Sequence, residues 1–127
     1  MKYLNLEQVL AIHKESIKRF GGSLEIRDKN LLESAILRPQ MSAFGQDAYP
    51  DLFAKAGVLL HSLVKNHAFV DGNKRTGFGA MHLMLLINNY DLIADEKQTY
   101  NFVISVAKGE ISEKEITLWL EKHSKKL

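Results

Sequence analysis

The segment from Asn73 to Asn89 carries apolar residues on nearly every face that a helix would present. A helix that is apolar all round has no side suited to water, so it belongs in the middle of a helical bundle. The rest of the chain must then supply the helices that cover it. This one segment therefore predicts an all-α fold around a central buried helix.

The remaining sequence has the spacing of amphipathic helices over most of its length. The expected helices cover residues 6–20, 28–38, 51–66, 100–107 and a stretch that starts after Ser112. Asn5, Asp51 and Ser112 can each accept hydrogen bonds from the first amides of the helix that follows. We expect a single domain over residues 1–127, built as a compact bundle of six to seven helices. Residues 39–50 contain both prolines and no helical period, and irregular segments of that length are often functional.

The composition excludes several classes of function. The chain has 127 residues, no cysteine and a formal net charge of +2. Without cysteine there are no disulfides and no thiolate zinc sites, and the charge is too small to indicate nucleic-acid binding. The most apolar run, residues 81–87, is far too short to span a bilayer, and nothing resembling a signal peptide follows Met1. We expect neither nucleic acid nor a membrane among the partners, and a cytoplasmic location.

Residues 67–78, HAFVDGNKRTGF, gather polar and charged groups at the start of the central helix. The first backbone N–H groups of a helix have no partners within the helix and carry partial positive charge. A loop that leaves them open is suited to phosphate. Gly72 lets the backbone turn tightly and lets a ligand come close. Lys74 and Arg75 add cationic donors, and the planar arginine fork matches two phosphate oxygens.

Two further residues of this cluster point to a reaction as well as to binding. Asp71 would repel phosphate unless a cation lay between them, and Mg²⁺ held by one carboxylate and by phosphates meets that need. His67 can take or give a proton near neutral pH. Together these residues predict phosphoryl or nucleotidyl transfer to a nucleophile that His67 activates.

Each residue also has an ordinary structural interpretation. His67 could cap the end of the preceding helix, Asp71 could cap the central helix, and Lys74 and Arg75 could be solvated charges. Phe69 is expected to anchor the loop in the core. The other histidines are expected to be core or groove residues in two cases, His61 and His82, and surface residues in two others, His13 and His123.

The stretch HAFVDGNKR, residues 67–75, resembles the signature of the Fic/Doc family, H-x-F-x-[DE]-G-N-x-R. Lys74 stands where the adenylylating Fic enzymes usually have glycine, and this looks like the death-on-curing (Doc) branch. The resemblance also covers residues 26–40, residues 49–78 and the Trp119–Leu120 pair near the C-terminus. A signature of this length is specific, so a chance match is improbable.

The resemblance implies a compact helical fold and a toxin of a bacterial toxin–antitoxin pair. Its activity would be ATP-dependent phosphorylation of a threonine of elongation factor Tu, which arrests translation. By position in the signature, His67 corresponds to the catalytic histidine, Asp71 to the acid that holds Mg²⁺, and Arg75 to the phosphate-binding arginine. Gly72 and Asn73 correspond to the anion-hole positions.

Lys74 corresponds to the residue considered to occlude the adenylylating pose, so that ATP lies reversed and offers its γ-phosphate. Residues 39–50 correspond to the flap that aligns the target in Fic proteins. Two alternatives to a kinase stay open at this point. One is an adenylyltransferase that acts on some other hydroxyl, and the other is a non-catalytic binding module on the same fold.

The resemblance also bears on regulation. Many Fic enzymes restrain themselves with an inhibitory helix, [ST]-x-x-x-E-[GN], whose glutamate competes for the phosphate-binding arginine. The nearest match, Thr117 to Glu121, is followed by Lys122 instead of Gly or Asn. We therefore expect Glu121 to lie on a solvated face, and we expect the inhibitory helix to come from a partner antitoxin whose tail folds into a groove of this domain.

Overall fold

The computed structural model describes all residues, 1–127, and is mostly helical. Its six α-helices are α1 (Leu6–Phe20), α2 (Lys29–Leu37), α3 (Leu52–Asn66), α4 (Asn73–Ile87), α5 (Glu96–Ala107) and α6 (Glu113–Lys122). A one-turn 3₁₀ helix, η1 (Arg38–Gln40), follows α2. Four short strands are β1 (Ser42–Ala43), β2 (Gln46–Asp47), β3 (Tyr90–Leu92) and β4 (Ser124–Lys126). The predicted all-α bundle of six to seven helices is confirmed.

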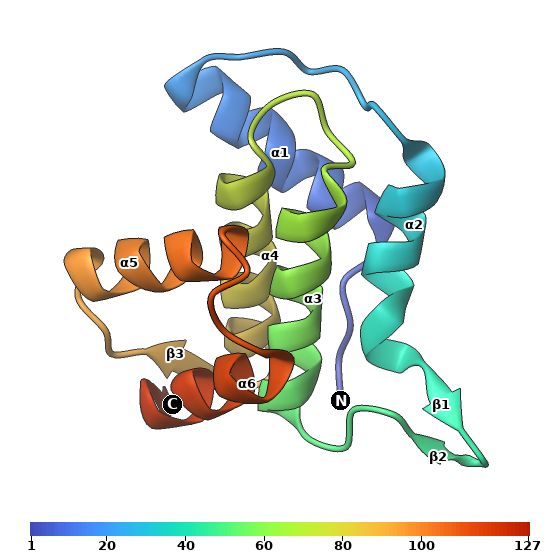
Figure 1. Cartoon of the computed structure of the whole chain (residues 1–127), viewed down its shortest axis with the longest axis vertical. Helices are drawn as coiled ribbons and strands as arrows, with labels where there is room; N and C mark the ends of the chain where they lie inside the picture. The colour runs from blue at the N-terminus through green and yellow to red at the C-terminus, as the bar shows by residue number, and fades with distance from the viewer.

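Helices α3 and α4 lie side by side at the centre of the bundle (Figure 1). Helix α1 packs on α4, α2 and α6 pack on α3, and α5 contacts both central helices. Helix α3 buries more of its residues than α4, whose side chains are only partly covered at Phe78, His82 and Leu83. The prediction that α4 is central is confirmed, but α3 is the more completely buried helix. No helix combines the length and the apolar character needed to cross a membrane.

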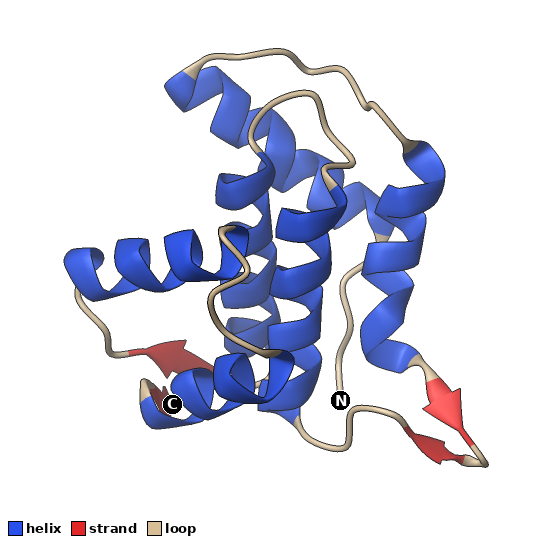
Figure 2. Cartoon of the chain, viewed as in Figure 1, coloured by secondary structure: helices blue, strands red, loops and turns tan.

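The strands form two small antiparallel pairs at the edge of the bundle, β1 with β2 and β3 with β4 (Figure 2). The second pair ties the C-terminus to the segment after α4. Helix α5 begins four residues earlier than the apolar pattern predicted, because Asp95 and Gln98 form a capping box there. The predicted caps at Asn5, Asp51 and Ser112 are confirmed.

The irregular segment 39–50 contains the β1–β2 hairpin, which turns at Phe44 and Gly45 with positive φ angles of 54° and 76°. It lies at the N-terminal end of α3, whereas residues 67–72 follow the C-terminal end (Figure 1). A helix of 15 residues is about 22 Å long, so it separates the two segments. The prediction that residues 39–50 act as a flap beside the site is therefore wrong.

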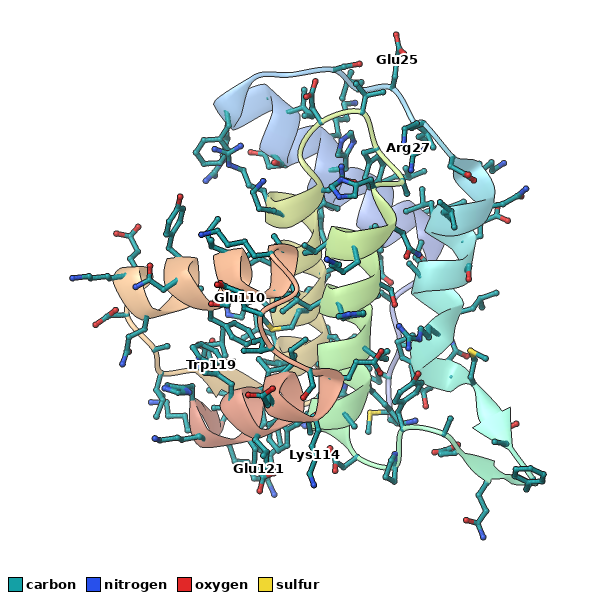
Figure 3. The ribbon with its side chains drawn as sticks, viewed as in Figure 1. Glu25, Arg27, Glu110, Lys114, Trp119 and Glu121 are labelled. Atoms are coloured by element: carbon teal, nitrogen blue, oxygen red, sulfur yellow. The ribbon has the colours of Figure 1, made fainter.

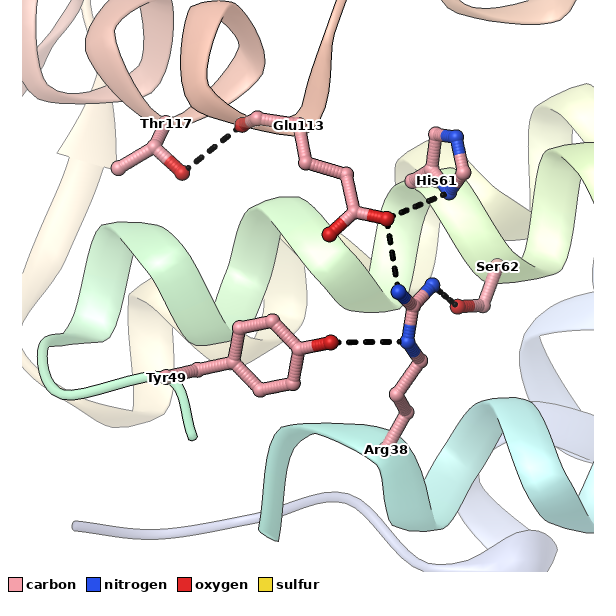
Figure 4. Close-up of polar contacts among 6 residues, drawn as sticks. All are labelled: Arg38, Tyr49, His61, Ser62, Glu113 and Thr117. Atoms are coloured by element: carbon pink, nitrogen blue, oxygen red, sulfur yellow. Dashed lines mark hydrogen bonds and ion pairs between the residues drawn. The ribbon is translucent and has the colours of Figure 1, made fainter. Parts of the chain in front are cut away.

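A polar network centred on Arg38 holds η1, α3 and α6 together (Figure 4). The guanidinium donates from Nε to the Tyr49 hydroxyl at 3.0 Å, from Nη1 to Ser62 Oγ at 2.9 Å and from Nη2 to Glu113 Oε2 at 2.7 Å. His61 Nδ1 lies 3.7 Å from the same Glu113 oxygen. Burial lowers the pKa of the His61 imidazole below its ordinary value of 6.5, with Arg38 acting in the same direction and Glu113 against it.

This pKa shift predicts a pH dependence of stability. The unfolded chain binds a proton at His61 more readily than the folded chain, so the free energy of unfolding falls as the pH drops below about 6.5 towards the lower folded pKa. We expect His61→Gln to lose less stability than the wild type between pH 7 and pH 5. Urea unfolding at several pH values measures this, and equal slopes against pH for the two proteins would refute the assignment.

Candidate functional site

The site is built on the loop between α3 and α4, residues 67–72, at one end of the bundle (Figure 1). His67 ends α3 in the left-handed conformation, with φ 50° and ψ 47°, and its side chain is exposed. The next two residues, Ala68 and Phe69, are buried in the core. The prediction that Phe69 anchors the loop is thus confirmed, and the exposed His67 next to it is free to meet a substrate.

The loop pairs with a distant segment, residues 22–28, which connects α1 to α2. The amide of Arg27 donates to Ala68 O at 2.8 Å and the amide of Val70 donates to Glu25 O at 3.1 Å. Between these bonds Ile26 and Phe69 form an isolated antiparallel bridge. We name residues 22–28 the clamp segment. The sequence gives no signal for it beyond Gly21 and Gly22, which predict only the end of α1.

His13 supports the loop from beneath, which corrects the prediction that it lies at the surface. It is 2% exposed, and its ring stacks on Phe69 with centroids 3.7 Å apart and planes inclined by 9°. Its Nε2 lies 2.8 Å from the backbone oxygen of Asp71. The signal was present in the sequence, because residue 13 falls on the same face of α1 as Val9 and Ile17, which are also buried.

Asn73 closes the loop on itself. Its side-chain Oδ1 accepts the amide of Phe69 at 3.0 Å, and its Nδ2 donates to Phe69 O at 2.9 Å. The side chain is therefore committed to the protein, and what Asn73 can offer to an anion is its backbone amide. This refines the expectation that Asn73 belongs to an anion hole.

Asp71 does not cap α4, so the structural alternative raised from the sequence is wrong. Its Oδ2 accepts the amide of Ser23 in the clamp segment at 2.7 Å, and its other oxygen accepts no hydrogen bond from the chain. Gly22 permits this approach, because a Cβ there would lie 2.9 Å from Asp71 Cβ. No cluster of three or more acidic, histidine or cysteine ligands occurs here. The site thus fits Mg²⁺ held by one carboxylate and otherwise by phosphate and water, not a metal enclosed by protein ligands.

The N-terminus of α4 is the only α-helix start in the structure without a side-chain cap. Gly72 occupies the cap position with φ 81°, and the first internal bond runs from Thr76 N to Gly72 O at 2.9 Å. The amides of Asn73, Lys74 and Arg75 therefore have no partner in the chain. Three open amides at the positive end of a helix are suited to bind an anion.

Lys74 and Arg75 are exposed on the first turn of α4. The Arg75 guanidinium lies over the ring of Phe20, 4.2 Å from its centroid, which is a cation–π contact with the last residue of α1. Both cations line an open groove of about 1280 Å³ between α1, α4 and the β3–α5 segment. The groove's apolar lining includes Ile12, Phe78, Leu92, Val103 and Ile104.

The remaining three histidines, His61, His82 and His123, lie in three different environments. His82 lines the groove as predicted, with Nε2 2.8 Å from Asp91 Oδ1, and this hydrogen bond lowers the pKa of the Asp91 carboxyl. His61 is partly buried in the Arg38 network. His123 was predicted at the surface, but it is half-buried and stacks on Trp119 at 4.1 Å between ring centroids.

Arg27 and Glu121 lie at opposite ends of the molecule (Figure 3). Arg27, which the sequence did not single out, lies beside the loop and donates from Nε to His67 O at 2.6 Å and from Nη2 to Asn66 O at 2.9 Å. Glu121 lies on α6 at the other end of the molecule and is exposed, so the predicted solvated position is confirmed. From there it cannot reach Arg75 as an inhibitory glutamate.

Comparison with known proteins adds independent information on this loop. A family model described as "Fic/DOC family" matches residues 3–85, more than half of the chain. A protein named "Toxin Doc" from Mycolicibacterium smegmatis is 49% identical over 94 residues, which cover 74% of this chain and 70% of that protein. A protein named "Protein kinase doc" from Escherichia phage P1 is 30% identical over 112 residues, which cover 88% and 87% of the two chains.

The double hydrogen bond of Asn73 yields a prediction about loop stability. Asn73→Asp keeps an acceptor for the Phe69 amide, but it replaces the donor to Phe69 O with a second oxygen, so two acceptors face each other. We expect a loss of about 1–3 kcal/mol in the free energy of unfolding and faster hydrogen exchange at the loop amides. Asn101→Asp on the exposed face of α5 is the matched control. Equal effects of the two substitutions would contradict the role of Asn73.

Proposed function

This chain belongs to the Fic/DOC family, as its signature predicted, and we propose that it is the toxin of a toxin–antitoxin pair that phosphorylates a protein hydroxyl with ATP. The observation that carries the proposal is the uncapped N-terminus of α4, preceded by the exposed His67. Our proposed target is a threonine of elongation factor Tu, following the family resemblance. The reaction would take place in the cytoplasm, where that factor works.

The chemistry assigns one role to each group of the loop. His67 takes the proton from the target hydroxyl, whose oxygen forms a bond to the γ-phosphorus of ATP while the bond from that phosphorus to the bridging oxygen breaks and ADP leaves. The amides of Asn73, Lys74 and Arg75 and the Arg75 guanidinium stabilise the negative charge on the transferring group. Asp71 is the residue that would hold Mg²⁺, which neutralises phosphate charge when bound.

Lys74 is the residue we assign to the choice of reaction. It is exposed on the first turn of α4, between two positions whose amides face the anion site. An ammonium group there competes for the space that the adenylylating pose requires and attracts the terminal phosphates instead. This assignment rests on the family resemblance, and it distinguishes the kinase from the adenylyltransferase alternative.

We propose that the clamp segment, and not residues 39–50, aligns the protein target. Its residues 25–27 pair with the catalytic loop through the backbone, and all three are exposed. Three apolar side chains are exposed along the two paired segments, at Leu24, Ile26 and Val70, with exposed fractions of 59%, 39% and 47%. An extended stretch of the target lying along this edge would bring its hydroxyl next to the base.

We further propose that the groove beside Arg75 receives a helix of the antitoxin. Its volume of about 1280 Å³ exceeds that of pockets for small ligands, about 300–1,000 Å³. It is lined by residues of α1, α4, β3 and α5, and 8 of its 19 lining residues are hydrophobic. An open groove with apolar and polar side chains suits an amphipathic helix. A carboxylate on that helix would pair with Arg75 or Lys74, which line the groove, and so exclude phosphate.

The position of the label decides between the two reactions. We expect transfer from γ-labelled ATP to elongation factor Tu, and a loss of at least about 100-fold in His67→Ala, the usual size of general base catalysis. In Lys74→Gly, γ-transfer should fall and α-transfer should become measurable. Transfer of the α-label by the wild type would establish the adenylyltransferase instead, and growth arrest by His67→Ala equal to the wild type would establish the non-catalytic module.

The groove assignment is tested by a charged residue placed in its wall. Ile104→Lys should weaken binding of the cognate antitoxin by at least about tenfold, because a lysine would be buried in an apolar contact, while kinase activity stays at the wild-type level. Leu118→Lys, at an exposed apolar position on α6 outside the groove, is the control. Equal affinities of the two variants, measured by calorimetry, would exclude this groove as the docking site.

A further inference from the structure

Arg27 makes contacts with the catalytic loop that the roles assigned above leave unexplained. Its Nε donates to the backbone oxygen of His67 at 2.6 Å, and its Nη2 donates to the oxygen of Asn66 at 2.9 Å. Its backbone amide also donates to Ala68 O at 2.8 Å. One residue of the clamp segment therefore holds three consecutive carbonyl groups, at Asn66, His67 and Ala68.

These carbonyls need a partner because of how α3 ends. In the other five α-helices the residue after the last turn donates its backbone amide to a carbonyl of that turn, but α3 shows no such bond. The helix instead stops at His67 in the left-handed region, which is unfavourable for a residue other than glycine. The Arg27 guanidinium donates hydrogen bonds to the Asn66 and His67 carbonyls in place of the missing backbone bond. It also places a positive charge at the negative end of α3.

The conformation of His67 also fixes where its imidazole can go. A histidine that continued α3 in the right-handed conformation would carry its side chain onto the helix surface and would not turn the chain towards Ala68 and Phe69. The two hydrogen bonds from Arg27 favour the left-handed turn, in which the side chain stays exposed while the next two residues are buried. No other side chain donates a hydrogen bond to the His67 or Asn66 carbonyl in the structure.

We propose that Arg27 is a positioning residue for His67, which holds the catalytic histidine in its left-handed conformation through the Asn66 and His67 carbonyls. This role rests on the proposed function of His67 as the base. Arg27 belongs to the clamp segment, beside which the target would lie. It therefore also links the position of the target to the position of the base, His67. A shift of this segment would move both together.

The simplest competing role for Arg27 is that of a helix-stabilising cation with no effect on the reaction. Lys29 offers a matched comparison, because it lies two residues away, is exposed, and has Glu33 as its one ion-pair partner, at 3.9 Å. Arg27→Gln and Lys29→Gln remove the same charge from the same surface. Arg27→Lys keeps the positive charge, but a lysine can donate to one of the two carbonyls at most. This variant therefore distinguishes the effect of the charge from the effect of the two hydrogen bonds.

The experiment combines kinetics with carbon NMR of His67. For Arg27→Gln we expect kcat to fall by about 10–100-fold with KM for ATP changed less than about twofold, because the base is misplaced and the phosphate site is intact. Arg27→Lys should recover part of kcat, and Lys29→Gln should match the wild type. Methylguanidinium added to Arg27→Ala should restore part of the rate, and it should not restore His67→Ala.

The NMR arm remains informative whatever the substrate proves to be. The Cα and carbonyl resonances of His67 report its backbone conformation and its hydrogen bond, and both should shift in Arg27→Gln but not in Lys29→Gln. If the wild type transfers no phosphate, the proposed function fails and these resonances alone decide the role of Arg27. Unchanged His67 resonances in Arg27→Gln, or a loss of thermal stability with kcat unchanged, would overturn the proposal.

Discussion

The pairing between the clamp segment and the loop at residues 67–71 is the interaction on which the site depends. Two helix ends meet at this loop, and neither is closed in the usual way: α3 has no backbone bond at its C-terminus, and α4 has no side-chain cap at its N-terminus. Open helix ends lose hydrogen bonds, so the connecting loop needs support from elsewhere in the chain. The Arg27 amide, which donates to Ala68 O, and the Glu25 carbonyl, which accepts the Val70 amide, provide this support. The amides that start α4 stay available to a ligand.

The polar cluster therefore contains two kinds of residue that look alike in the sequence. Asn73 and one oxygen of Asp71 are engaged in holding the loop, with His13 packed beneath it. His67, Lys74 and Arg75 are exposed and are available for chemistry. The signature therefore combines exposed residues, which we propose act in the reaction, with residues that hold the loop in place. Substitution of a supporting residue should change stability and activity together, whereas substitution of His67 should change activity alone.

The sequence predicted the features that depend on interactions between residues close together in the chain. Helical periodicity and caps such as Asp51 located the helices, and the polar cluster located the site, because both are encoded within a few residues. The clamp segment was missed because its partners lie about forty residues away and leave no periodic trace. His13 was misjudged because its polarity was weighed above its position on the buried face of α1. The length of the irregular segment 39–50 suggested a flap, but length does not show at which end of α3 the segment lies. Because it precedes α3 and the loop at residues 67–72 follows α3, the two lie a helix length apart.

The central claim is that phosphate binds to the open amides at the start of α4. Amide NMR during titration with ATP and Mg²⁺ tests it most directly, without a protein target. The account predicts saturable shifts that are largest at Asn73, Lys74 and Arg75, with little change along α6, which lies at the far end of the bundle. Binding of ATP that leaves those three amides unchanged, with shifts confined to other parts of the chain, would contradict it.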